Sequence, residues 1–251
     1  MRPKYKKLLS FLSVIIVLLI AYLFLANARI YKIIGSASLP SPDTKHEYTI
    51  LGSPDKTNTV IYTALGDSLT AGVGTTNYEQ SYPYIFAEKI STGSKSLTLY
   101  DRAYPGARTS DVIKNLLSTA ITDQPDVVTV LVGANDIHDH TSEKEFSQNY
   151  QYILTQLKTK TKAKIFAVSI PYLGTNNLLL PPYNTYFKNR TVKFNLIIKK
   201  LAEENNIKYI DLYTPTENFF DDPTMHAADF FHPTAKAYNL WAKIIYANYN
   251  K

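Results

Sequence analysis

The sequence of 251 residues contains no cysteine, and it has only nine glycines and one tryptophan. Without cysteine the chain forms no disulfide, holds no thiolate metal site and carries no thiol nucleophile or lipid-modified cysteine. Acidic residues are missing before Asp43. That first segment holds six basic residues, so it accounts for the formal charge of +6, and the other 21 basic residues balance the 21 acidic ones. A neutral remainder argues against a surface that follows the phosphates of nucleic acid.

A long uncharged apolar run lies near the amino end. It extends from Leu8 to Leu25 after the basic stretch RPKYKK, and as a helix of 18 residues it would cover about 27 Å, close to the hydrocarbon thickness of a bilayer. The basic flank favours a cytoplasmic amino terminus and an exported body. We therefore predict a single-pass membrane anchor over residues 1–28. The small residues ANA at 26–28 leave a second interpretation open, in which a signal peptide is cleaved and the body is secreted.

The rest of the chain divides into a polar segment and a folded domain. Residues 29–58 are rich in Ser, Pro, Gly and Asp, which is typical of a linker, here an extracellular one. From 59 to 251, short apolar runs alternate with helix-period segments, which predicts a three-layer α/β/α domain around five parallel strands. The expected strands are TVIYTALG ending at Gly66, LTLYDR from Leu97, DVVTVLVGAND from Asp126, KIFAVSIPY from Lys164 and IKYIDLY from Ile207. The expected helices lie near 81–92, 109–121, 142–159, 185–205 and 234–249.

Short polar motifs follow three of these strands, at the sheet edge where such domains bind their ligands. GDS contains Ser68, YPGART contains Gly106, and GAND contains Asn135, while DFFHP before the last helix contains Asp229 and His232. Acyl transfer needs a nucleophile, a base, a group that orients the base, and donors for the developing oxyanion. These five residues can fill all four roles if the loops that carry them meet.

Each candidate role follows from the chemistry of its side chain and its position. Ser68 is the candidate nucleophile because it stands at an expected helix start, where its backbone N–H also favours an oxyanion. His232 is the candidate base, and Asp229 can accept its second ring N–H. Gly106 has no side chain to block a bound acyl group, and the Asn135 amide donates without carrying charge. Each motif by itself also fits a plain turn or a helix cap.

Taken in chain order, four motifs of this sequence resemble the blocks that name the SGNH, or GDSL, hydrolases. They are GDSLTAG, YPGART, GAND and DFFHP, and they extend over most of the body, from about Thr59 to Tyr249. The pattern is most similar to that of bacterial extracellular or membrane-tethered members. One position departs from it, since many members have Asn five residues before the Gly of the second block, where this chain has Asp101.

The resemblance implies both a site and a chemistry. It implies a flavodoxin-like fold, a catalytic triad of Ser68, His232 and Asp229, and an oxyanion hole built from the Ser68 and Gly106 N–H groups and the Asn135 side chain. The expected activity is that of an extracytoplasmic serine esterase or lipase with no metal or organic cofactor. The expected substrate is an acyl ester of a lipid, such as a lysophospholipid, or of a glycan. The membrane is an expected partner through the N-terminal helix, whereas nucleic acid is not.

Several alternatives stay open at this point. The same triad suits a deacetylase or an acyltransferase acting on a cell-wall or extracellular polysaccharide, and a non-catalytic surface binding module is a further possibility. The segment NLLLPPYNTYF at 177–187 is expected either to wall an acyl pocket or to pack under its own loop. His138 and His140 suggest a metal pair, but two histidines in a polar loop need a third ligand, and we expect them to be solvated.

Overall fold

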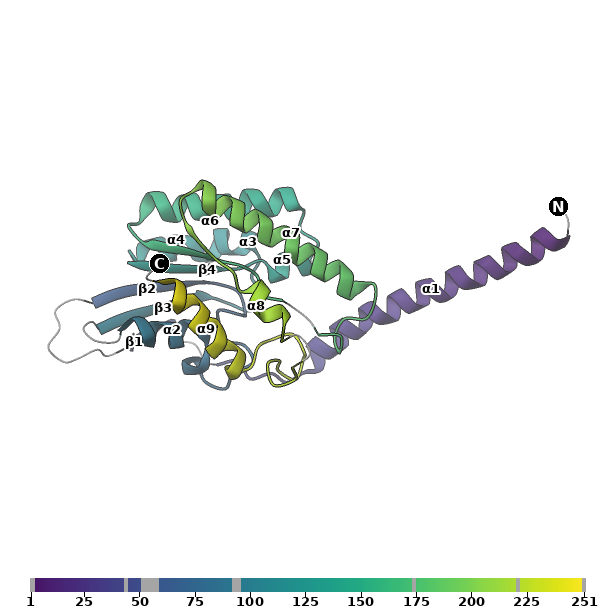
Figure 1. The fold of residues 1–251 in the computed structure, drawn as a ribbon, viewed down its shortest axis with the longest axis horizontal. Coiled ribbons are helices and arrows are strands. Elements are labelled where there is room, and N and C mark those ends of the chain that lie inside the picture. Colours follow the sequence, from purple (N-terminus) through teal and green to yellow (C-terminus); the bar gives the residue numbers. More distant parts are fainter. Residues whose placement is uncertain are drawn as a thin grey trace.

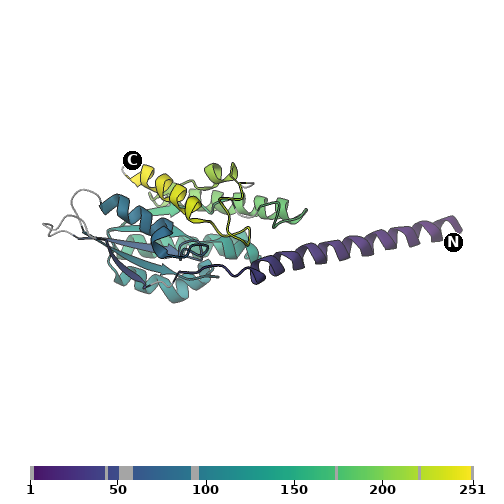
Figure 2. The same ribbon diagram turned by 90° about the horizontal axis from the view of Figure 1, so that it is seen from below.

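A six-stranded mixed sheet forms the centre of the protein (Figures 1 and 2). The computed structural model describes residues 3–42, 45–50, 59–91, 96–172, 175–219 and 222–249. The strand order is β1-β3-β2-β4-β5-β6. The strands are β1 (Glu47–Ile50), β2 (Thr59–Gly66), β3 (Ser96–Ala103), β4 (Val127–Leu131), β5 (Lys164–Val168) and β6 (Lys208–Ile210).

The five predicted strands are confirmed, and they pair in parallel as expected. The sheet is nevertheless mixed, because β1 adds an antiparallel edge strand in which Glu47 pairs with Tyr100 and Ile50 with Leu97. This strand lies inside the predicted linker 29–58. With only four residues, it is too short to stand out from the polar residues around it. The last part of that linker, 51–58, lies outside the described residues.

Helices cover both faces of the sheet (Figure 1). On one face α2 and α9 pack against each other, and on the other face lie α4, α6 and α7. The helices of these two layers are α2 (Tyr82–Ser91), α4 (Leu117–Thr122), α6 (Glu143–Lys160), α7 (Tyr183–Glu204) and α9 (Ala235–Tyr249). Shorter elements connect them, namely η1 (Tyr78–Gln80), α3 (Thr109–Asp111), the π-helical η2 (Val112–Leu116), α5 (Ala134–His138) and α8 (Tyr213–Glu217).

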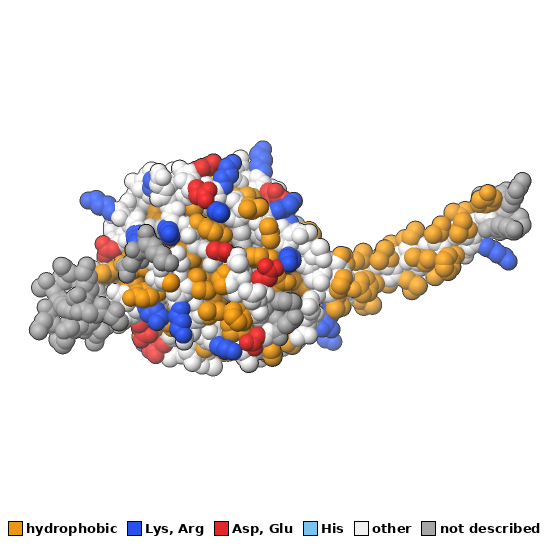
Figure 3. Space-filling model, viewed as in Figure 1, with side chains coloured by type: hydrophobic (Ala, Val, Ile, Leu, Met, Phe, Trp, Pro, Cys, Tyr) orange, Lys and Arg blue, Asp and Glu red, His pale blue; other side chains and the backbone are white. Residues whose placement is uncertain are grey.

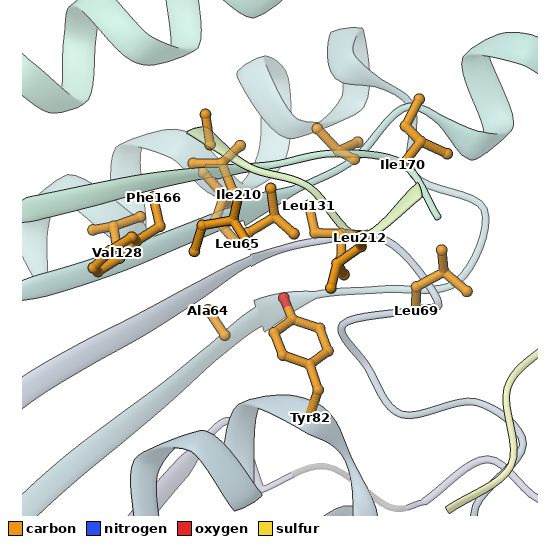
Figure 4. Close-up of a cluster of buried hydrophobic side chains, with 14 of the residues drawn as sticks. Ala64, Leu65, Leu69, Tyr82, Val128, Leu131, Phe166, Ile170, Ile210 and Leu212 are labelled. Atoms are coloured by element: carbon orange, nitrogen blue, oxygen red, sulfur yellow. The ribbon is translucent and has the colours of Figure 1, made fainter. Parts of the chain in front are cut away.

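The core lies between the sheet and these two helical layers. Parallel strands covered on both faces consist mainly of apolar residues, and all five residues of β4 are buried. On one side Tyr82 rises from α2 toward the sheet near Ala64 (Figure 4). On the other side Phe146 of α6 stacks on Phe194 of α7 with ring centroids 4.0 Å apart. This packing fixes the carboxyl ends of β2, β3 and β4, from which the candidate site residues follow.

The helix α1 (Pro3–Ser36) leaves the body as a long rod (Figures 1 and 2). Within its segment Tyr5–Ser36 an 18-residue window reaches a mean hydropathy of 2.9, and among the described helices this is the one long and apolar enough to cross a membrane. A signal sequence near an amino terminus also meets these criteria of length and hydropathy. The helix continues eight residues beyond the predicted anchor and enters the segment predicted as a linker. Its outer part is covered with exposed apolar side chains (Figure 3).

Candidate active site

Ser68, His232 and Asp229 meet beyond the carboxyl end of β2. The Ser68 Oγ lies 3.0 Å from Nε2 of His232, and Nδ1 of His232 lies 2.6 Å from Oδ2 of Asp229. Asp229 is fully buried, whereas Ser68 and His232 keep 5% and 9% of their surface exposed. This arrangement allows the imidazole to take the hydroxyl proton while the carboxylate fixes the ring tautomer and orientation.

Ser68 lies in a series of tight turns. The sequence predicts the start of a helix here, and this prediction is wrong. The strand β2 ends at Gly66, and the Asp67 carbonyl then accepts the backbone N–H of Ala71 at 2.9 Å, as in a first helical turn. Gly72 follows with φ at 78°, which ends the helical path because that region suits glycine. The turn is sharp enough to hold the Ser68 hydroxyl at the edge of the sheet.

The loop before α9 positions His232 through Asp229. Oδ1 of Asp229 accepts the backbone N–H groups of Phe231 and His232, both at 3.0 Å, while Oδ2 faces the imidazole. Burial by itself raises the pKa of the Asp229 carboxyl. The hydrogen bonds and charge of His232, together with the Phe231 N–H, outweigh burial and hold that pKa below its usual range. The carboxylate therefore stays charged and continues to orient the His232 imidazole through its hydrogen bond with Nδ1.

Gly106 and Asn135 complete the set of predicted residues around one cavity. Gly106 follows β3 and has φ at 85°, a conformation that side chains disfavour. Asn135 lies in the first turn of α5, and its Nδ2 donates to the Ala107 carbonyl at 3.0 Å, which leaves its second N–H for another acceptor. Both residues line the cavity that Ser68 and His232 also line.

Asp136 ties the second and third motifs together. Its carboxylate accepts the backbone N–H of Thr109 at 2.9 Å and the Thr109 hydroxyl at 2.6 Å. Asp136 is almost fully buried, which raises its pKa, and the two bonds from Thr109 counter that rise. The cross-link holds the loop after Gly106 against α5 and thereby sets the position of Asn135 relative to Gly106.

The profile of the GDSL-like Lipase/Acylhydrolase family matches residues 64–240, which include all five candidate residues. The chain belongs to this family. The curated relative spore germination lipase LipC of Bacillus licheniformis is 26% identical over 204 residues, which are 74% of this GDSL hydrolase and 94% of LipC.

Solved structures show the same fold. The lipase/acylhydrolase of Enterococcus faecalis has a TM-score of 0.62 at 20% identity, over 75% of this chain and 94% of that one. A catalytic mutant of Axe2, an acetylxylan esterase of Geobacillus stearothermophilus, has a TM-score of 0.60 at 16% identity, over 79% of this chain and 95% of that one. Both likenesses cover the α/β body, which is therefore an SGNH-type domain.

The cavity of this GDSL hydrolase has a volume of about 250 Å³ and a mainly apolar lining. Leu178, Leu179 and Phe187 come from the segment 177–187 and are also part of the buried core, so that segment both walls the cavity and packs under its loop. The remaining apolar lining residues were not expected from the sequence. They are Ile30, Ile34, Val73, Pro105 and Phe231. Of these, Phe231 could have been predicted to lie near the site, since it stands directly before His232 in DFFHP.

The two histidines considered as a metal pair contact other side chains of the protein. Nδ1 of His138 lies 3.0 Å from Oδ1 of Asp139, and Nδ1 of His140 lies 2.8 Å from the Tyr186 hydroxyl. His138 is half-buried and lines the cavity, while His140 is exposed. Within the described ranges, no group of three or more His, Cys, Asp or Glu side chains is arranged to hold a metal ion.

Proposed function

We propose that this GDSL hydrolase is a serine esterase of the lipase type, with Ser68, His232 and Asp229 as its catalytic triad. The observation that carries the proposal is the continuous line from the Ser68 hydroxyl through the His232 ring to the Asp229 carboxylate, with contacts of 3.0 and 2.6 Å. A buried carboxylate, an imidazole and a hydroxyl in this order are the parts that nucleophilic acyl transfer requires.

The reaction proceeds in two steps through an acyl-enzyme. Ser68 Oγ attacks the ester carbonyl carbon while Nε2 of His232 takes the hydroxyl proton, and the tetrahedral oxyanion accepts hydrogen bonds from the Ser68 and Gly106 N–H groups and the Asn135 amide. His232 then gives its proton to the leaving alcohol as the ester bond breaks. Water, deprotonated by His232, attacks the acyl-enzyme and releases the carboxylic acid and the free Ser68 hydroxyl.

The cavity supports an acyl substrate, and the amino end supports an exported, membrane-held enzyme. The cavity beside Ser68 is lined mainly by apolar side chains, which suits the acyl part of an ester. Basic residues precede the apolar run of α1, and by the positive-inside rule they favour a cytoplasmic amino terminus with the catalytic body on the outer side.

The test is the loss of hydrolysis in Ser68→Ala. We expect wild-type protein to hydrolyse p-nitrophenyl acetate and to react with a fluorophosphonate probe, and we expect Ser68→Ala to do neither while it keeps its thermal unfolding midpoint. Ser118→Ala is the matched control, since Ser118 is an exposed serine on α4. Undiminished turnover or labelling of Ser68→Ala would show that Ser68 is not the nucleophile.

A further inference from the structure

The helix α1 has two parts that differ in their surroundings. From Tyr5 to Tyr22 every residue is exposed. From Leu23 onward one side of the helix is covered by the body, and this side consists of residues spaced three or four positions apart, which places them on a single helix face. They are Leu23, Ala26, Ile30, Ile33 and Ile34. Ala26 and Ile30 are 2% and 3% exposed, so this part of α1 is docked on the catalytic domain.

Three side-chain hydrogen bonds connect α1, from Tyr22 onward, to the segment around 177–183. The Tyr22 hydroxyl donates to the Pro181 carbonyl at 2.7 Å, and the Tyr183 hydroxyl donates to the Leu23 carbonyl at 3.1 Å. The Arg29 guanidinium donates to the Asn177 carbonyl at 2.6 Å. The same segment carries Leu178 and Leu179, so α1 and this wall of the cavity are held together.

Ile30 and Ile34 of α1 line the cavity that also contains Ser68 and His232. We propose that α1 is a functional part of the acyl pocket, in which Ile30 and Ile34 determine the acyl chain that fits, and that the pocket receives this chain from an amphiphilic ester in the membrane that α1 crosses. This proposal rests on the esterase function proposed above. It assigns α1 a role in substrate selection in addition to anchoring.

The depth of the pocket relative to the membrane follows from the length of α1. The apolar run ends at Leu25, and Ile30 lies five residues further along the helix, or about 7.5 Å at 1.5 Å per residue. The headgroup layer outside the hydrocarbon is itself about 5–7.5 Å thick. Ile30 and the cavity therefore stand at the headgroup surface, where Tyr22 and Tyr183 also match the preference of tyrosine for the interface.

An ester at this depth meets Ser68 without leaving the membrane entirely. Its acyl chain is apolar and already lies parallel to α1, so it can pass along the apolar side chains of the helix into the cavity. A soluble acylated glycan gains nothing from a wall that is built by a membrane helix. The geometry therefore favours a lipid-type amphiphile over a soluble glycan as the source of the acyl group.

The same contacts oppose removal of the anchor at the ANA sequence. A cut after Ala28 would fall between Ala26 and Ile30, both of which are buried against the body. The remaining turns would lose the part of α1 that holds them in place. An uncleaved anchor is therefore the form in which the pocket keeps its wall.

Chain-length preference tests the role of Ile30 and Ile34 in the full-length protein. In detergent, kcat/KM is measured for p-nitrophenyl esters of two to sixteen carbons, and the ratio for octanoate over acetate is compared between variants. We expect Ile30→Ala and Ile34→Ala to move the preference to longer chains and Ile34→Trp to shorter ones, each changing the ratio by about tenfold, since one methylene in an apolar pocket is worth about tenfold or more. Ile20→Ala is the matched control, because Ile20 is 61% exposed in the outer part of α1.

A second measurement tests the source of the ester. Full-length protein is reconstituted in phosphatidylcholine vesicles, and p-nitrophenyl palmitate is placed either in the same vesicles or in a separate population. We expect at least tenfold faster hydrolysis in shared vesicles and a decrease of that rate by Ile34→Trp. Unchanged ratios in all pocket variants, or equal rates in the two vesicle arrangements, would overturn the inference. If the esterase function itself is wrong, wild type and Ser68→Ala will hydrolyse the acetate ester at the same background rate.

Discussion

Gly74 and Pro233 lie so close together that a Cβ atom on Gly74 would stand 2.3 Å from the Pro233 carbonyl oxygen. Gly74 also has φ at 99°, which disfavours any side chain. Pro233 directly follows His232, and Gly74 ends the turns that begin at Ser68. The contact between these two loops therefore sets the distance from the hydroxyl to the imidazole.

Gly74→Ala should separate the two loops and weaken the reaction. A shift of about 1 Å at the reacting groups can cost about 100-fold in rate, so we expect kcat for p-nitrophenyl acetate to fall by about that factor. Gly35→Ala is the matched control, because a Cβ at Gly35 of α1 meets nothing within 4 Å. Equal activity of Gly74→Ala and Gly35→Ala would show that this contact does not set the geometry.

Asn135→Ala should lower kcat with little change in KM, since the amide is proposed to bind the oxyanion and not the ground-state ester. The expected loss is about 3 kcal/mol of transition-state stabilisation, or 100- to 1,000-fold in kcat. Asn115→Ala serves as a control, because Asn115 is exposed and its amide donates to the Tyr104 hydroxyl. Steady-state kinetics that show a raised KM and an unchanged kcat would contradict the oxyanion role.

Asp229→Asn should preserve the conformation of the loop but favour the wrong tautomer of the His232 imidazole. The Asn carbonyl can still accept the backbone N–H groups of Phe231 and His232, but its NH₂ group then faces Nδ1 of His232 and places the ring proton on Nε2, where it blocks transfer from Ser68. We expect kcat to fall by about 10,000-fold at neutral pH with an unchanged unfolding midpoint. A decrease in kcat of less than tenfold would show that Asp229 is not a member of the triad.

Acid should reduce the rate of the wild-type enzyme, because a protonated His232 cannot act as the base. The lowered pKa of Asp229 keeps its carboxylate charged through the same range, so the decline should follow a single proton. The measurement is kcat/KM against pH from neutrality down to about pH 4, with unfolding monitored in parallel. A flat profile over this range would exclude His232 as the base.

Asp101→Asn should remove a pH dependence of stability. Burial raises the pKa of Asp101 to about 8, and the facing Tyr78 hydroxyl and the Arg102 charge offset this rise only in part. Between the usual carboxyl range near pH 4 and pH 8, the folded protein holds a proton that the unfolded chain has released. Stability from this group is therefore full below about pH 4 and is lost as the pH rises through 8.

The neutral Asn side chain does not lose stability in this way. We expect Asp101→Asn to raise the free energy of unfolding at pH 8.5 by about 1–3 kcal/mol relative to the wild type, and to have a smaller effect at pH 5. Thermal unfolding in detergent at the two pH values measures the difference. Equal shifts at both pH values would show that Asp101 does not titrate in the folded protein.

The sequence already indicated the body of the fold and the loops that carry the candidate site. Apolar runs bounded by polar motifs marked five strands, because parallel strands buried on both faces have few polar residues. Since the carboxyl ends of such strands meet at one edge, the motifs of Ser68, Gly106 and Asn135 were expected there together. Local departures remained, such as the turn that replaces a helix after Ser68, because Gly72 acts against the helical pattern of its neighbours.

The sequence by itself determined the family of this protein, its α/β body and the chemical identity of the candidate residues, because these depend on local motifs and on the period of apolar residues. Only the tertiary structure decided that β1 forms an edge strand of the sheet and that Ile30 and Ile34 line the cavity. The apolar run of α1 up to Leu25 shows no packing face, since the hydropathy pattern marks such a face only where the other side is polar. Ile30 and Ile34 lie beyond that run, in a segment whose composition predicts a linker and not a helix. The docking of α1 depends on long-range contacts with Asn177, Pro181 and Tyr183, and these exist only once the body has folded.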